Sequence, residues 1–159
     1  MTNEKQVSFI RYFAKQWSAM LEFEPPIEGC TDEEIEDIRR SQGVPRLPAL
    51  YVEFIRKFGR KTGGLEWECG MDLTYPKVCD FKKFPLRVLR DSNVFIFGMN
   101  GYEDALSFFN VAEDDPIVYW ATIDIDVVED IGVINTGEFP HLKNYRFSDW
   151  LIDFTITES

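Results

Sequence analysis

The chain has 159 residues, with 17 basic and 28 acidic side chains that give it a net charge of −11. This surplus of carboxylates repels phosphate backbones and anionic lipid surfaces, so we expect no nucleic-acid binding and no membrane binding. With 45% apolar residues, among them 14 Phe, 6 Tyr and 4 Trp, the chain can bury one core without a metal or a disulfide scaffold.

The cysteines and the N-terminus indicate a cytoplasmic protein. Cys30, Cys69 and Cys79 cannot all pair within one chain, and none has the spacing of a zinc site. We therefore expect free thiols in a reducing compartment. The first residues are polar, and no stretch approaches the roughly 18 consecutive apolar residues of a membrane span.

Two amphipathic helices are predicted at the start of the chain. Apolar residues recur every three or four positions within residues 7–21, which is the period of a helix with one buried face. The next helix follows Thr31, whose spacing from Glu34 is that of a capping box, and Gly43 is its expected C-terminal stop.

A third helix is predicted from Pro48 to Gly59, because proline suits a first helical turn and apolar residues follow at helical spacing. A last, short helix is predicted near the C-terminus with Ser148 as its N-cap, followed by Trp150, Leu151 and Phe154.

Between these helices the pattern favours short strands. Glu66 and Glu68 flank Trp67, so in a strand the indole would face the core, opposite the charges. We expect a turn at residues 98–101, after an apolar run. The predicted strands are residues 65–69, 93–98, 106–111, 117–120 and 123–127, with another near Val133.

The fold class is therefore α+β, with a mostly antiparallel sheet, N-terminal helices and one C-terminal helix. Without a repeat or a low-complexity linker, we expect residues 1–159 to form a single domain.

The segment from Val44 through Leu47-Pro48, Tyr51 and Phe54-Ile55, followed by Gly63-Gly64, resembles the signature of the SUKH superfamily, which includes the Smi/Knr family. Residues 114–120 and 147–151 resemble that family's acidic-proline strand and C-terminal helix. The resemblance covers about residues 28–155, while a helix over about residues 5–22 is additional. It implies the SUKH fold and no general catalytic activity. Its bacterial members are typically immunity proteins that bind and block toxin domains, often nucleases, and its fungal members are cell-wall glucan-synthesis regulators.

Acidic residues dominate the second half of the chain. Residues 91–142 contain 11 acidic side chains and no Lys or Arg. Asp124 and Asp126 would lie about 7 Å apart on one face of a strand. A metal or paired-carboxylate site, a solvated strand face and a partner surface all remain open for them. As a partner surface, the predicted acidic strip comprises Asp114, Asp115, Asp124, Asp126, Glu129 and Asp130.

The other candidate residues have simpler interpretations. His141 is the single histidine, and it follows Pro140 without a nucleophile motif nearby, which favours an ordinary surface role. Trp67, Tyr75, Tyr119 and Trp120 are of the types enriched in binding hot spots, although a small core would use most of them for packing.

The leading hypothesis is a non-enzymatic immunity protein that blocks a basic toxin domain, possibly a nuclease, by steric and electrostatic occlusion. The alternative is a Smi/Knr-type regulatory module that binds other cellular proteins. A carboxylate-dependent hydrolase using Asp124 and Asp126 is the third hypothesis. We expect no cofactor, no metal, and a monomer or weak homodimer.

Overall fold

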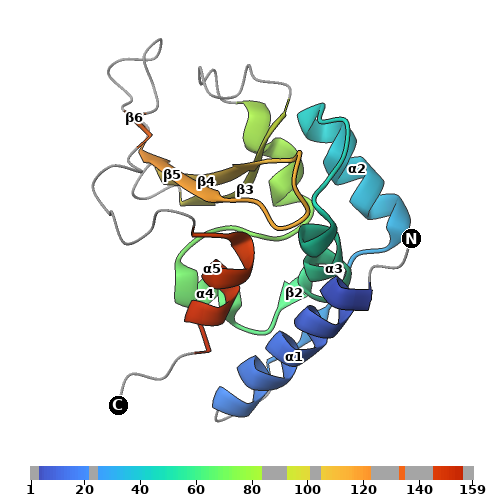
Figure 1. Ribbon diagram of the computed structural model, residues 1–159, viewed down its shortest axis with the longest axis vertical. Coiled ribbons are helices and arrows are strands. Elements are labelled where there is room, and N and C mark those ends of the chain that lie inside the picture. Colours follow the sequence, from blue (N-terminus) through green and yellow to red (C-terminus); the bar gives the residue numbers. More distant parts are fainter. Residues whose placement is uncertain are drawn as a thin grey trace.

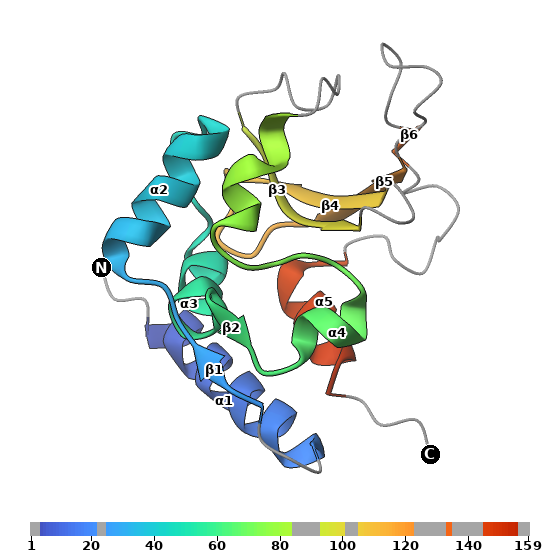
Figure 2. The ribbon, with the colours of Figure 1, turned by 180° about the vertical axis from the view of Figure 1, so that it is seen from behind.

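The computed structural model describes residues 4–21, 25–83, 93–100, 105–122, 133–134 and 145–155. Five α-helices, one 3₁₀ helix and two antiparallel sheets are assigned within these residues, so the predicted α+β class is confirmed. Figures 1 and 2 show the larger sheet on one side of helix α3 and helix α1 on the other. The helices are α1 (Glu4–Met20), α2 (Asp32–Gln42), α3 (Ala49–Phe58), α4 (Leu65–Cys69) and α5 (Phe147–Asp153), and the 3₁₀ helix is η1 (Lys77–Lys83).

The larger sheet has the strand order β3-β4-β5-β6, and every neighbouring pair is antiparallel. Its first two strands pair Phe95 with Phe109 and Ile96 with Phe108, and the register then shifts before Gly98. The smaller sheet pairs β1 with β2. The strands are β1 (Ile27–Glu28), β2 (Lys61–Thr62), β3 (Val94–Asn100), β4 (Ala105–Asn110), β5 (Val118–Thr122) and β6 (Val133–Ile134).

The first three helices confirm the sequence patterns that predicted them. Thr31 accepts a hydrogen bond from the Glu34 backbone N–H at 3.2 Å, and the Glu34 carboxylate accepts one from the Thr31 backbone N–H at 3.0 Å. Gly43 ends α2 in the left-handed region with φ of 67°. Helix α3 begins directly after Pro48 and ends before Gly59. Local capping signals therefore define this part of the fold.

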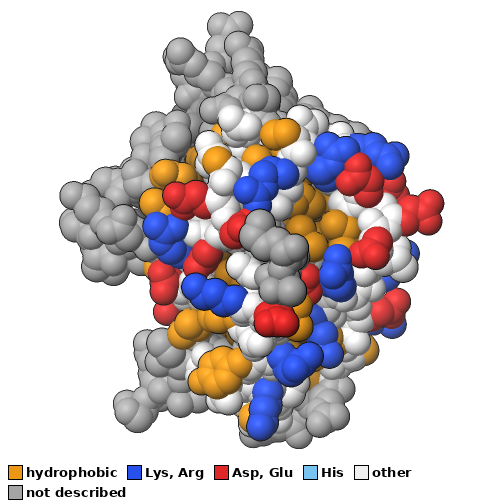
Figure 3. Space-filling model, turned by 45° about the vertical axis from the view of Figure 1, so that its right-hand side comes forward, with side chains coloured by type: hydrophobic (Ala, Val, Ile, Leu, Met, Phe, Trp, Pro, Cys, Tyr) orange, Lys and Arg blue, Asp and Glu red, His pale blue; other side chains and the backbone are white. Residues whose placement is uncertain are grey.

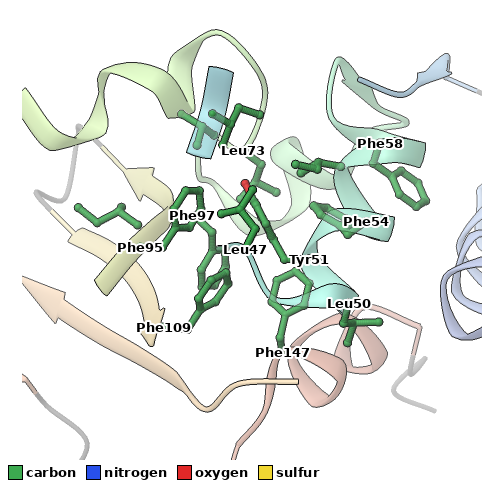
Figure 4. Packing of buried hydrophobic residues seen from close by; sticks show 14 of the residues in the cluster. Leu47, Leu50, Tyr51, Phe54, Phe58, Leu73, Phe95, Phe97, Phe109 and Phe147 are labelled. Carbon is green, nitrogen blue, oxygen red and sulfur yellow. The ribbon is translucent and has the colours of Figure 1, made fainter. Parts of the chain in front are cut away.

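Helix α3 is the centre of the hydrophobic core. On one side, the ring of Phe58 packs edge-on against Phe13 of α1, with centroids 5.5 Å apart. On the other side, Tyr51 packs against Phe95 at 5.0 Å and against Phe147 of α5 at 5.8 Å. Figure 4 shows the rings of Tyr51, Phe95 and Phe147 converging from α3, the sheet and α5. The three segments thus share one aromatic cluster.

Three local predictions were wrong. Leu65–Cys69 forms helix α4 instead of a strand. The N-cap of α5 is Arg146, and Ser148 lies inside the first turn of that helix. Strand β3 continues through Gly98 to Asn100, where a turn was expected. A strand is assigned at Val133–Ile134, as predicted, whereas the strand predicted over residues 123–127 lies outside the described residues.

Candidate functional site

The acidic bend between β4 and β5 contains the two predicted partner-binding residues that the structure describes. The Asp114 carboxylate accepts a hydrogen bond from the Ala49 backbone N–H at 3.3 Å and forms an ion pair with Arg46. Its backbone carbonyl accepts a further hydrogen bond, from the Leu50 N–H at 3.0 Å. Asp114 therefore satisfies backbone donors at the start of α3.

The neighbouring Asp115 satisfies a backbone donor at the start of α5. One carboxylate oxygen of Asp115 accepts from the Ser148 backbone N–H at 3.0 Å, and the other accepts from the Ser148 hydroxyl at 2.6 Å. The Asp115 carbonyl also accepts from the Arg146 guanidinium at 2.7 Å. Two adjacent carboxylates thus hold the N-terminal ends of two helices that are far apart in the sequence.

The rest of the predicted acidic strip lies outside the described residues. Asp124, Asp126, Glu129 and Asp130 belong to this group, and their assignment to a partner surface stays a prediction. His141 also lies outside the described residues. Since Asp114 and Asp115 have intrachain partners, changing either one would disturb the fold as well as any interface.

Trp67 is the largest exposed apolar side chain in the described part of the molecule. Its side chain lies on α4 and is 89% exposed, compared with 59% for Tyr12 and 36% for Met20. The prediction that Trp67 packs in the core is therefore wrong. In a helical turn, Leu65 takes the buried position, at 0% exposure, and Trp67 projects outward with Glu68.

Helix α4 is short, and contacts from both flanking segments hold it in place. The Glu66 backbone N–H donates to the Thr62 hydroxyl at 3.1 Å. The Glu66 carboxylate accepts from the backbone N–H groups of Leu73 and Thr74, at 2.7 and 2.9 Å. These contacts fix the backbone on either side of Trp67, so the indole is presented from a defined position.

The turn that precedes α4 depends on glycine. Gly63 and Gly64 have φ values of 63° and 91°, in the left-handed region that side chains disfavour. A Cβ on Gly63 would lie 2.7 Å from Cγ1 of Ile27, and the Gly63 carbonyl accepts a hydrogen bond from the Trp17 indole at 2.9 Å. This turn attaches α4 to β1 and α1.

Trp67 has acidic neighbours in the chain. Glu68 is exposed and forms no ion pair with another described residue, while the exposed Asp72 pairs with Lys77 at 3.1 Å. We name Trp67 and Glu68, with the neighbouring Asp72, the α4 surface. It combines an apolar anchor with negative charge, and it would suit a basic partner that has an apolar pocket.

The other three candidate aromatics are packed to different degrees. Tyr75 is partly buried, donates a hydrogen bond to Asp37 at 3.3 Å and lies 5.6 Å from the Arg60 guanidinium. Tyr119 stacks on Phe108 across the sheet, with centroids 5.5 Å apart. Trp120 is partly buried opposite Ser107. Packing therefore accounts for these side chains better than it does for Trp67.

The thiols in the structure are free, as predicted. Burial raises the pKa of Cys30 to about 12 and that of Cys69 to about 11, so both are protonated at neutral pH. Neither thiol has the low pKa of an activated nucleophile. The pKa of Cys79 is also raised, again mainly by burial.

Within the described residues, no group of three or more His, Cys, Asp or Glu side chains is arranged to hold a metal ion. Among the helices of the same residues, none has both the length and the apolarity required to cross a membrane. Comparison with protein-family models, with curated proteins and with solved structures gave no match, so the fold and the α4 surface are the observations that bear on function.

Proposed function

We propose that this chain is a non-enzymatic binding protein that contacts its partner through the α4 surface. The observation that carries the proposal is the 89% exposure of Trp67 on a helix with a fixed backbone. Leaving an indole in water forgoes about 1.5–3 kcal/mol of favourable burial, which a partner's pocket would recover. Tryptophan is among the residues that most often dominate binding energy.

The resemblance to SUKH proteins favours one version of this function, an immunity protein that blocks a cognate toxin domain. Glu68 and the chain's net charge of −11 would attract a cationic substrate cleft, such as that of a nuclease, and speed its encounter. Insertion of Trp67 would then slow dissociation. Occupation of the cleft would exclude the toxin's own substrate.

The test uses the protein encoded by the gene next to this one. We expect its expression to stop cell growth, and co-expression of this chain to restore growth. Trp67→Ala should lose that protection while keeping the circular dichroism of the parent. Tyr12→Ala is the matched control, because Tyr12 is also an exposed aromatic side chain but lies on α1. Full protection by Trp67→Ala would show that the α4 surface does not bind the toxin.

The second candidate function is a regulatory module of the Smi/Knr type without a toxin partner. It rests on the same exposed Trp67, since a regulatory partner would need the same anchor. A neighbouring gene product that is harmless, together with Trp67-dependent binding to another cellular protein, would favour this version.

A further inference from the structure

A groove of about 500 Å³ runs between α1 and α3, and no residue of the α4 surface is among those that line it in the described part of the chain. Its floor is apolar and comes from Val7, Ile10 and Ala14 of α1 and from Ile27 of β1. Ile10 and Ala14 are buried, whereas Val7 and Ile27 are partly exposed. The floor therefore offers apolar area that the chain itself leaves uncovered.

Four basic side chains line this groove. Arg11 and Lys15 come from α1, where they are one helical turn apart, and Arg56 and Lys57 come from the last turn of α3. Among the described residues of the lining, Glu53 is the one acidic side chain. These described residues thus carry a formal charge of +3 in a chain whose net charge is −11.

The positive charge in the groove is largely uncompensated. Arg56 donates to the Glu53 carboxylate at 3.2 Å and to the Asp32 carboxylate at 3.0 Å. Arg11, Lys15 and Lys57 are exposed, and none of them forms an ion pair with another residue in the described ranges. Figure 3 turns this helical side of the molecule forward and shows Lys and Arg side chains lying among apolar and acidic ones.

We infer that this groove binds an acidic peptide segment of another protein, in which apolar side chains are flanked by Asp or Glu. The apolar residues would cover Val7 and Ile27, and the carboxylates would pair with Arg11, Lys15 and Lys57. Grooves between helices are a common binding mode for amphipathic segments. The basic side chains of the lining select the acidic class by charge complementarity, and repulsion from the rest of this acidic chain would confine such a segment to the groove.

This inference is independent of the proposed function. The α4 surface is acidic and suits a basic partner, whereas the groove is basic and suits an acidic one. The chain would therefore have two binding surfaces of opposite charge, formed by different helices.

The test measures binding of a labelled peptide by fluorescence anisotropy at low salt. The probe has about 15 residues, enough for four helical turns, with Leu at helical spacing and Glu at the flanking positions. We expect saturable binding, and at least tenfold weaker binding of the same peptide with Gln in place of Glu. Equal binding of the two peptides would overturn the inference.

Charge-reversal variants locate the site. Lys15→Glu and Lys57→Glu lie on opposite sides of the groove, and each should weaken binding roughly five- to tenfold. Lys5→Glu is the matched control, since Lys5 is an exposed residue of α1 that does not line the groove. Val7→Asn should also weaken binding, because it places a polar group on the apolar floor.

Three results would contradict this assignment. Equal affinities of Lys15→Glu and Lys5→Glu would show that the peptide binds elsewhere. Capture of the protein by phosphatidylserine vesicles, without peptide binding, would assign the groove to a membrane surface. Dimerisation that is lost in Lys15→Glu would assign it to a second copy of the chain. Trp67→Ala should bind the peptide as tightly as the parent does, because Trp67 does not line the groove. The peptide assay therefore tests the groove even if the function proposed for the α4 surface is wrong.

Discussion

The side-chain amide of Gln42 pairs with the backbone of Ile96 as a neighbouring strand would. Its nitrogen donates to the Ile96 carbonyl at 2.7 Å, and its oxygen accepts from the Ile96 N–H at 2.8 Å. β3 is an edge strand of the larger sheet, and Gln42 is only 2% exposed at the end of α2. One side chain therefore satisfies two buried backbone groups at a sheet edge.

We expect Gln42→Leu to lower the free energy of unfolding by about 2–4 kcal/mol, because both Ile96 groups and the Val78 carbonyl, which also accepts from this amide at 3.3 Å, would lose a buried partner. Urea denaturation followed by circular dichroism measures this change. Ser41→Ala is the control, since Ser41 is an exposed neighbour whose hydroxyl donates to the Ile38 carbonyl in its own helix and not to the sheet. A loss below about 0.5 kcal/mol in Gln42→Leu would mean that water replaces the amide.

The Asp115 carboxylate should stabilise the fold whether or not it meets a partner. We expect Asp115→Ala to lower the free energy of unfolding by about 1–2 kcal/mol, because the Ser148 N–H and hydroxyl lose their acceptors. Glu33→Ala provides the comparison, as Glu33 is an exposed acidic residue in the first turn of α2. Equal stability of the two variants would contradict the capping role.

Glu34 makes stability depend on pH in the acid range. The Arg60 hydrogen bond, followed by that of the Thr31 backbone N–H, lowers the pKa of Glu34 from 4.5 to about 2. Because its folded-state pKa lies below the unfolded value, Glu34 contributes its full stabilisation above about pH 4.5. That contribution is lost as the pH falls from about 4.5 to about 2.

Glu34→Gln should therefore be less stable than the parent at pH 7, with the difference disappearing near pH 2. Glutamine can still accept from the Thr31 N–H, so the variant isolates the loss of charge. Glu36→Gln is the control. Arg39 also lowers the pKa of Glu36, but that side chain is 42% exposed, compared with 10% for Glu34, and solvent screens its ion pair. A pH-independent difference for Glu34→Gln would contradict the assignment.

The Tyr51 hydroxyl is buried without a hydrogen-bond partner among the described residues, and burial raises the pKa of this phenol. Figure 4 shows the ring in the aromatic cluster between α3, the sheet and α5. We expect Tyr51→Phe to raise the free energy of unfolding by about 1 kcal/mol, since an unpaired buried polar group is costly. Tyr51→Ala should lower it by about 3–5 kcal/mol through cavity formation. A destabilised Tyr51→Phe protein would reveal a partner for the hydroxyl.

Local signals in the sequence were sufficient to predict an element where its end residues and its hydrophobic period indicate the same structure. Thr31, Glu34 and Gly43 define α2 by contacts within a few residues, and the apolar run before Gly98 becomes a strand covered on both faces. These features depend on short-range chemistry, which the sequence displays directly.

The candidate site could not be predicted in the same way. Five residues around Trp67 fit an alternating strand as well as one helical turn, and the outcome depends on Thr62 before them and on Leu73 and Thr74 after them. Ser148 resembled an N-cap, but its hydroxyl donates to Asp115, 33 positions earlier. The groove needs α1 beside α3, a tertiary arrangement that no local pattern contains.

Asp114 and Asp115, the adjacent aspartates of the acidic bend, also couple local unfolding at the N-terminal ends of α3 and α5. Asp114 bonds the Ala49 amide across 65 positions, and Asp115 bonds the Ser148 amide across 33. Because both hydrogen bonds need the β4–β5 turn, we expect the first turns of α3 and α5 to become ordered late in folding, after long-range contacts have formed. Ala49 and Ser148 should therefore exchange their amide hydrogens with solvent in a single cooperative opening, although 99 positions separate them in the chain.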